Sequence, residues 1–277
     1  MTYLQMLEEG CGRLQEASIE EARQDATLLL LEVSGFSRAD LFLEGQEQMP
    51  AEKEEDFRRL LARRVQHEPL QYLIGEQDFC GLPFSVRKGV LIPRPETELL
   101  AEAVFRSSEG KKVLDLCTGS GCIAITVARL GKPALVAASD LSADALKLAQ
   151  ENAAKNNAEV TFFCGDLFAS VCGRYDIIVS NPPYIRSDVI ATLMPEVREY
   201  EPRLALDGSE DGLVFYRRIV NEAPDYLEQN GRLMFEIGHD QGKAVTELMR
   251  QRGFEDIEVR KDYAGLDRMV FGVWSGK

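Results

Sequence analysis

The sequence predicts an α/β protein in which a mostly parallel β-sheet follows a small all-α domain. Residues 1–75 carry apolar residues at helical spacing, without long β-branched runs. From residue 111 onward, short apolar runs alternate with helical patterns, which is the order typical of βαβ units. The 277 residues suffice for one large domain, or for one of ordinary size with a small companion.

A helix is predicted over residues 18–35 of the first domain. Ser18 precedes it and Glu21 follows three positions later, the pattern of a capping box. Gly35 is placed to end the helix, because glycine readily adopts the left-handed conformation of a C-terminal cap.

A second helix is predicted over residues 51–66, where charged and apolar residues alternate at helical spacing. Arg63 and Arg64 near its end are expected to lie on a solvated helix face, as most charge runs do, with a basic contact patch as the alternative. The first 75 residues contain 8 Lys and Arg against 15 Asp and Glu, so this domain is acidic.

A β-hairpin over residues 76–92 is expected to link the first domain to the second. Aromatic and β-branched residues alternate there around glycine and proline. The Pro-x-Pro stretch at 93–95 cannot lie inside a helix, so the next helix is predicted to begin at Glu96. The expected domains are therefore residues 1–75, the linker 76–92 and a catalytic domain 93–277.

Seven strands are predicted in the catalytic domain, at residues 111–117, 134–140, 160–166, 175–181, 231–238, 254–262 and 267–274. Helices are predicted between them, at residues 121–130, 143–156, 212–227 and 243–253. The last two strands have too short a connection for a crossover, so they must be antiparallel. A parallel sheet that ends in a reversed strand is the seven-stranded, Rossmann-like arrangement of S-adenosylmethionine-dependent methyltransferases.

The turn after the first of these strands has the residues of a cofactor-binding loop. The loop consists of Cys117, Thr118, Gly119, Ser120 and Gly121. Glycine lets a ligand approach the backbone closely, and the following helix presents free N–H groups to an anion. Asp140 ends the second strand, where a carboxylate can accept from ribose hydroxyls. A plain turn and an NAD(P) site remain alternatives, because Gly119-x-Gly121-x-x-Ala124 fits the dinucleotide pattern.

S-adenosylmethionine is the cofactor expected from the wider set of residues. Asp115 in the first strand would meet its ammonium group, the loop amides its carboxylate and Asp140 its ribose. Asp166, which ends the third strand, would accept from the adenine amino group, and Leu167 and Phe168 would flank the ring. An Asx turn is the alternative for Asp166.

The fourth strand ends in the rigid corner Asn181-Pro182-Pro183-Tyr184. The Asn181 side-chain oxygen and the Pro182 carbonyl are two acceptors that can hold a planar –NH2 group, whose donors are costly to desolvate unpaired. Tyr184 offers a flat face and a hydroxyl. An NAD(P) enzyme has no use for this corner, whereas a methyltransferase acting on adenine N6 or on a glutamine amide has.

Five segments, HEPLQYLIG, FCGLPFSVRKGVLIPRPETELL, DLCTGSGCIA, SNPPYI and EIGHDQG, closely resemble those of bacterial release-factor glutamine N5-methyltransferases, the PrmC/HemK family. The resemblance covers most of the chain. It implies a helical domain that recognises the substrate, a hairpin linker and a catalytic domain. It also implies methylation of the glutamine in the Gly-Gly-Gln motif of class 1 peptide-chain release factors, with S-adenosylmethionine as methyl donor.

By this resemblance, the loop from Cys117 to Gly121, Asp140 and Asn181 contact the cofactor, and Asn181 to Tyr184 hold the glutamine. Cys117 replaces a glycine that the family often has, so its side chain is expected to point away from the ligand, or the loop to be rearranged. Leu167 stands where the family often has tryptophan, which would weaken stacking on adenine. Phe84 in the hairpin is expected to form a further wall of the glutamine pocket.

Composition argues against other classes of protein. A net charge of -14 disfavours direct nucleic-acid binding, because phosphates are neutralised by Lys and Arg. No apolar run reaches the about 20 residues of a membrane helix and no secretory signal is recognisable, so a cytoplasmic protein is expected. With two histidines and no C-x-x-C, no metal site is expected. The alternatives are a DNA adenine N6-methyltransferase and a non-catalytic release-factor-binding module.

Overall fold

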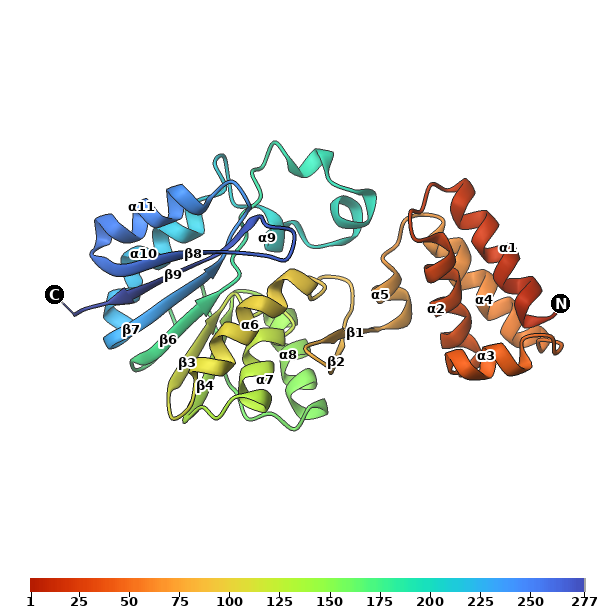
Figure 1. The fold of residues 1–277 in the computed structure, drawn as a ribbon, viewed down its shortest axis with the longest axis horizontal. Coiled ribbons are helices and arrows are strands. Elements are labelled where there is room, and N and C mark those ends of the chain that lie inside the picture. The colour runs from red at the N-terminus through yellow and green to blue at the C-terminus, as the bar shows by residue number, and fades with distance from the viewer. Residues whose placement is uncertain (277) are drawn as a thin grey trace. The chain divides into compact units, whose positions relative to one another are not determined.

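The computed structural model describes residues 1–276, which form two compact units (Figure 1). The first unit comprises residues 1–76 together with 194–200, and the second comprises 77–193 and the chain from Glu201 onward. The sequence prediction placed residues 194–200 in the catalytic domain, whereas the structure packs them with the helical unit. Within the described residues, no helix has the length and apolar character needed to cross a membrane.

The first unit is a helical bundle with its own apolar core. Its helices are α1 (Tyr3–Glu16), α2 (Ala22–Ser34), α3 (Arg38–Glu44), α4 (Ala51–Arg64) and α5 (Leu70–Ile74). Leu14, Leu29, Leu30, Phe57 and Leu61 from three of these helices are completely buried. Each helix contributes one apolar stripe, and the stripes stabilise the unit by meeting in a shared core.

The start of α2 differs from the prediction, although its end is confirmed. No capping box forms, because Ser18 has a left-handed backbone (φ 60°) and the helix begins four residues later, at Ala22. Glu21 is the N-cap residue and makes no side-chain capping bond. Gly35 ends α2 with a φ of 73°, in the left-handed conformation expected of it.

Arg64 is buried, so the expectation that it lies on a solvated face is wrong. Its guanidinium bonds Asp25 at 2.7 Å and Glu196 at 3.0 Å, and the Arg64 and Asp25 side chains are both only 8% exposed. Burial raises the pKa of Glu196, but bonds from its own backbone, His67 and Arg64 together hold that pKa below its usual range. Arg64 therefore neutralises two carboxylates and fixes the 194–200 segment to the bundle. Arg63 is half exposed and pairs with Glu68 at 2.6 Å.

The second unit is built on a seven-stranded sheet in the order β5-β4-β3-β6-β7-β9-β8, as predicted for a methyltransferase. The strands are β3 (Lys112–Leu116), β4 (Leu135–Asp140), β5 (Thr161–Cys164), β6 (Tyr175–Ser180), β7 (Leu227–Glu236), β8 (Phe254–Lys261) and β9 (Asp267–Trp274). Strand β9 is antiparallel to both of its neighbours, β7 and β8, and the other adjacent strands are parallel. Strand β6 lies next to β3 and runs parallel to it. The loops that follow these two strands therefore leave the same edge of the sheet side by side.

Helices cover both faces of the sheet (Figure 1). They are α6 (Pro95–Ser107), α7 (Cys122–Leu130), α8 (Ala143–Lys155), α10 (Val214–Tyr226) and α11 (Gly242–Arg252), with the short α9 (Arg203–Leu206) in a long loop. Ile178 of β6 packs with α10 and α11, whereas its neighbours Ile177 and Val179 pack with α6 and α7. This alternation is the period of two that a strand buried on both sides requires.

The hairpin consists of β1 (Glu76–Phe79) and β2 (Leu82–Ser85), and most of it belongs to the second unit. Asn152 of α8 exchanges two hydrogen bonds with the Ser85 backbone, at 2.8 and 3.1 Å. Asn156 donates to the Pro83 carbonyl at 2.9 Å. These bonds attach β2 to α8, so the hairpin belongs with the second unit.

We expect Arg64→Leu to lower the free energy of unfolding by about 3–5 kcal/mol, because it leaves buried carboxylates without a counter-charge. Arg63→Leu is the matched control and should change it by no more than about 1 kcal/mol, since that ion pair is exposed to solvent. Urea denaturation of the full chain measures both values. Equal, small effects of the two substitutions would contradict the structural role given to Arg64.

Candidate active site

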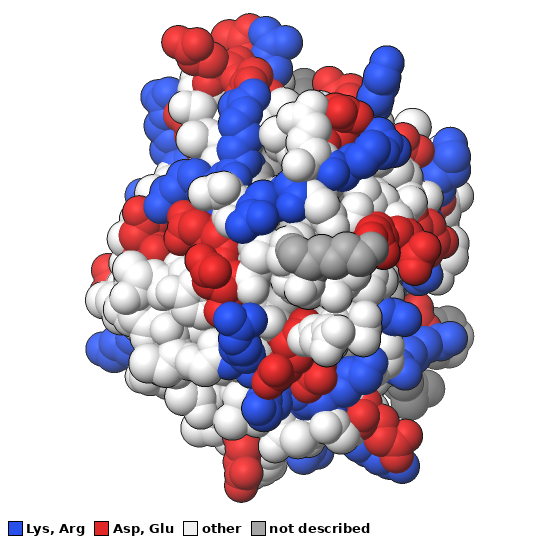
Figure 2. Space-filling model, turned by 90° about the vertical axis from the view of Figure 1, so that its left-hand side faces the viewer, with Lys and Arg blue, Asp and Glu red and all other residues white. Residues whose placement is uncertain are grey.

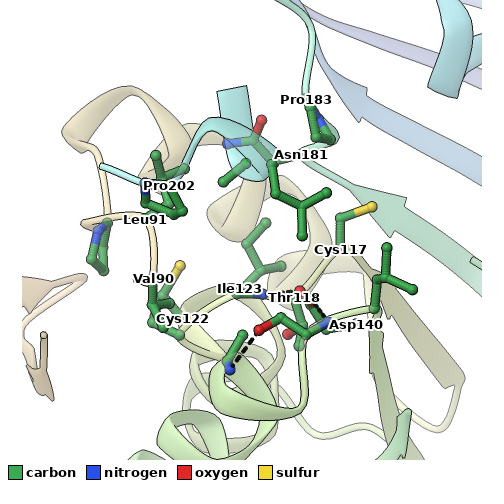
Figure 3. A pocket seen from close by; sticks show the side chains of 18 of the residues that line it. Val90, Leu91, Cys117, Thr118, Cys122, Ile123, Asp140, Asn181, Pro183 and Pro202 are labelled. Atoms are coloured by element: carbon green, nitrogen blue, oxygen red, sulfur yellow. Dashed lines mark hydrogen bonds between the residues drawn. The ribbon is translucent and has the colours of Figure 1, made fainter. Parts of the chain in front are cut away.

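A cavity lies at the carboxyl edge of the parallel strands, where open α/β sheets bind ligands (Figure 3). Its empty volume is about 1020 Å³, a figure that includes open solvent. Asn181 and Pro183 lie on one side of it and Thr118 and Asp140 on the other. Residues that follow β3, β4 and β6 therefore share one space, which is large enough for a nucleoside-sized ligand.

Asp140, at the end of β4, holds the glycine loop that follows β3. One carboxylate oxygen of Asp140 accepts from the Gly119 amide and the other from the Ser142 amide, both at 2.8 Å. Burial raises the pKa of Asp140, and these amides oppose the rise. Each oxygen keeps a further lone pair, so Asp140 can still accept bonds from a ligand in the cavity.

Asp115 does not line the cavity but lies beneath the same loop. It is completely buried, and its Oδ2 accepts from the Thr118 hydroxyl at 2.6 Å and the Ala124 amide at 3.3 Å. Its Oδ1 has no hydrogen-bond partner among the described residues. Burial raises the pKa of Asp115 to about 7. Its predicted contact with the cofactor stays a prediction, while its role in fixing the loop is direct.

Cys117 lines the cavity and has a φ of 60°, in the region that favours glycine. Its side chain also packs against the apolar core of the second unit. A β-carbon in this conformation costs about 1–2 kcal/mol. Gly121, at the end of the loop, has a φ of 83° and lies just outside the cavity lining.

The residues after β5 divide between cavity and core. Asp166 and Leu167 both line the cavity, and Asp166 pairs with Arg218 at 2.8 Å. Phe168, considered as a second neighbour of adenine, instead lies in the core, stacked on Tyr226 with ring centroids 4.5 Å apart. Leu167 is therefore the apolar side chain that this turn presents to a ligand.

In the corner after β6, Asn181 and Pro183 line the cavity, whereas Pro182 and Tyr184 do not. The Asn181 Nδ2 donates to the Thr97 hydroxyl at 3.2 Å, and nothing within residues 1–276 donates to its Oδ1. The Tyr184 hydroxyl donates to Glu236 at 3.2 Å. Burial, followed by the Glu236 charge, raises the pKa of Tyr184, which keeps this phenol protonated.

Phe84 does not form a wall of this cavity, so that prediction is wrong. The side chain is completely buried and meets the Phe79 ring edge-on, at 5.9 Å between centroids. Both rings belong to the apolar core formed with α6 and α7. The pleat of β2 turns Phe84 into that core, because side chains of a strand alternate between faces.

Two segments of the cavity wall were not predicted from the sequence as site residues. The first is residues 89–94, which precede α6, and the second includes Pro202, Leu204 and Ala205 around α9. Arg94 forms an ion pair with Glu201, whose side chain is only 1% exposed, and this pair attaches the second segment to the first. The sequence IPRPETE, part of a segment that carries the family resemblance, overlaps the first of these segments. No local sequence pattern indicated that the second would line the cavity.

Charges of both signs mix on the face shown in Figure 2, where Lys and Arg side chains lie among Asp and Glu side chains. That face offers no continuous basic stripe of the kind a nucleic-acid backbone binds. Among residues 1–276, no group of three or more His, Cys, Asp or Glu is arranged to hold a metal ion.

Comparison with known proteins matches two family models to the chain. Residues 5–75 match the PrmC N-terminal domain, and residues 95–196 match the methyltransferase small domain. A relative from Geobacter sulfurreducens, named release factor glutamine methyltransferase, is 45% identical over 263 residues, which are 94% of this chain and 93% of the relative. One of the same name from Clostridium acetobutylicum is 40% identical over 271 residues, 95% of each chain.

Among solved structures, a methyltransferase from Pyrococcus furiosus is similar with a TM-score of 0.56. It is 19% identical and covers 72% of this chain and 91% of its own. At this identity the similarity shows the fold alone, and it supports the Rossmann-like methyltransferase architecture of the second unit.

We expect Gly121→Ala to lower the free energy of unfolding by about 2–4 kcal/mol, through backbone strain and overpacking. A β-carbon there would lie 2.8 Å from the Ile125 Cδ1 and 3.1 Å from the Ala149 Cβ. Gly110→Ala is the control, because Gly110 also has a positive φ (69°) but meets no atom within 4 Å. This substitution should lower the free energy of unfolding by only about 1–2 kcal/mol, because backbone strain alone contributes. Chemical denaturation that gave the two variants equal stability would contradict the packing of the loop against α7 and α8.

Proposed function

The chain belongs to the release factor glutamine methyltransferase family, and from that membership we propose that it methylates the side-chain nitrogen of the glutamine in the Gly-Gly-Gln motif of class 1 peptide-chain release factors. The methyl donor is S-adenosylmethionine, in keeping with the methyltransferase fold and the family model matched by the second unit. The observation that carries the proposal is that Asn181 and Pro183 share one cavity with the glycine loop and Asp140.

The donors and acceptors around the cavity fit this cofactor. Asp140 keeps lone pairs for ribose hydroxyls after accepting two backbone amides. The buried Asp115 Oδ1, which has no partner among the described residues, is an acceptor suited to an ammonium group. Loop amides near Gly119 suit a carboxylate. When bound, S-adenosylmethionine supplies an electrophilic methyl group carried on a sulfonium.

Asn181 and Pro182 orient the glutamine. In the described chain, neither the Asn181 Oδ1 nor the Pro182 carbonyl accepts a hydrogen bond, and these two atoms are the proposed acceptors for the two N–H groups of a carboxamide. Accepting both N–H groups draws electron density towards the amide nitrogen and fixes its direction. Prolines at 182 and 183 keep this corner rigid, so the positioning costs little reorganisation at the moment of reaction.

No side chain needs to act as a strong base. The amide nitrogen becomes acidic only once it carries the methyl group, so its proton can then leave to water. Tyr184 is unsuited to remove it, because its raised pKa keeps the phenol protonated and its hydroxyl already donates to Glu236. The Arg94–Glu201 pair attaches the segment around α9 to the wall of the cavity.

The helical unit is proposed to recognise the release factor, with the reaction taking place in the cytoplasm. Its match to the PrmC N-terminal domain and its acidic composition, 8 Lys and Arg against 15 Asp and Glu in residues 1–75, support a basic protein partner. The same acidity disfavours a nucleic-acid substrate.

The proposal is tested by incubating the full chain with release factor and S-adenosylmethionine, then mapping the product by mass spectrometry. We expect a mass gain of one CH2 on the glutamine of Gly-Gly-Gln. Asn181→Ala should lower kcat by about 100- to 1,000-fold, as loss of a preorganised polar contact does, with little change in cofactor affinity. Asn221→Ala, at an exposed position of α10, is the control and should leave kcat unchanged. Methyl transfer to DNA, with none to release factor, would contradict the proposal.

Cofactor binding should strengthen as pH rises from 6 to 7. Asp115 attracts an ammonium group by its charge when it is ionised and not when it is protonated. Its pKa is raised to about 7, so at pH 6 most molecules carry the protonated form. The ionised fraction grows about fivefold over this interval, and the dissociation constant should fall by the same factor. Calorimetric titration of the wild type and of Asp115→Asn, which cannot ionise, separates this group from others. Equal pH dependence of the two proteins would exclude Asp115 as the titrating residue.

A further inference from the structure

The opening of the cavity is bordered by apolar side chains that the second unit does not cover. Leu141, after β4, and Leu204, in α9, both line the cavity, and both are more than half exposed to solvent. Their exposed parts face outward, where only a ligand that extends beyond the cavity can cover them. A protein that presents one glutamine to the cavity is such a ligand.

The turn that joins β8 to β9 lies at the same edge of the sheet (Figure 1). Strand β9 is antiparallel to β7 and sets Met269 opposite Glu236, whose carboxylate accepts from the Tyr184 hydroxyl at 3.2 Å. Residues 262–266, which precede β9, therefore project beside the Asn181–Tyr184 corner. Strand β9 is two positions from β6 in the sheet, so about 10 Å separates these two strands.

Asp262 holds this turn in one conformation. One oxygen of its carboxylate accepts from the Ala264 amide at 2.9 Å and from the Leu266 amide at 3.0 Å. The other oxygen accepts from the Arg268 guanidinium at 3.1 Å. Tyr263 takes no part in these bonds and is 92% exposed. The turn thus holds in water an aromatic side chain whose contacts it does not need for its own conformation.

The size of a protein interface indicates what covers this turn. A glutamine side chain extends only about 5 Å from its Cα, because each of its bonds is roughly 1.5 Å long, so the domain that carries the glutamine must come close to the cavity. An interface of standard size covers about 800 Å² on each partner, which is a disc of roughly 16 Å radius. Such a disc, centred on the Asn181–Tyr184 corner, reaches β9 and the turn before it.

We propose that Tyr263 and Leu266 form a docking surface for the release-factor domain that carries Gly-Gly-Gln, so that the catalytic unit itself recognises the folded substrate. The inference rests on the proposed function and deepens it. Tyrosine is among the residue types that contribute most to protein interfaces. Because the turn is already fixed, docking orders only the Tyr263 side chain, whose two χ angles carry little conformational entropy.

The test measures binding of full-length release factor to the full chain in the presence of S-adenosylhomocysteine, together with the kinetics of methylation. Tyr263→Ala should raise the dissociation constant by about 10-fold or more, as loss of an aromatic interface anchor does. KM for release factor should rise with it, whereas kcat at saturating release factor and the affinity for cofactor should stay within about 2-fold, because no group at the reacting atoms changes. Tyr263→Phe keeps the ring and should bind nearly as tightly as wild type.

Leu266→Ala and Leu135→Ala are a matched pair of variants. The two leucines are 45% and 43% exposed, but Leu135 begins β4 and therefore lies at the opposite edge of the sheet. Leu266→Ala should weaken binding of release factor by about 5-fold, as loss of a moderate interface contact does. Leu135→Ala should leave that binding unchanged.

Unchanged binding in Tyr263→Ala, or a fall in its kcat without a rise in KM, would overturn the inference, as would equal losses of binding in Leu266→Ala and Leu135→Ala. Dimerisation of wild type that Tyr263→Ala abolishes, with release-factor binding unaffected, would assign the turn to a second copy of the chain and also overturn it. Failure of the proposed function is distinct, because wild type would then leave the release factor unmethylated.

Discussion

Parallel pairing of β3 with β6 is the constraint on which the rest of the site depends. It sets Leu116 beside Ser180, so the glycine loop and the Asn181–Tyr184 corner leave the sheet side by side. The Ser180 hydroxyl reinforces the pairing by donating to the Leu116 carbonyl at 2.8 Å. In the proposed reaction the cofactor lies against one loop and the carboxamide against the other, so this pairing favours a positioning mechanism over one that relies on strong acids or bases.

Buried carboxylates organise the site around this edge. Asp115 fastens the glycine loop to β3 and α7, Asp140 holds it from β4, Glu201 anchors the segment around α9, and Glu236 accepts from Tyr184 in the corner after β6. Each takes donors from backbone amides, hydroxyls or arginine, since an unpaired buried charge would be costly. An acidic protein can thus use part of its negative charge as internal hydrogen-bond acceptors, and each of these acceptors fixes the direction of the donors around it.

The chain that follows the corner contributes to both compact units. Residues 194–200 pack with the helical bundle through Glu196 and Arg64, while Glu201, the next residue, pairs with Arg94 beside the cavity. Domain boundaries drawn from composition place each unit in a continuous stretch of sequence. Such boundaries do not show that residues 194–200 pack with the helical unit, because a seven-residue segment has too little hydrophobic periodicity to indicate which core it joins.

The sequence by itself determined the fold class, the seven strands, the reversed final strand and the loops that carry the site. These features depend on local periodicity, on glycine and proline, and on connection lengths, all of which are readable along the chain. Only the tertiary structure decided that Phe84 lies in the core, that Arg64 is buried, and that Asp115 lies beneath the loop. It alone connected Asn181 to Thr97 and Tyr184 to Glu236, since those contacts join residues more than 50 positions apart, and no local pattern encodes which side chains face each other across a packed interior.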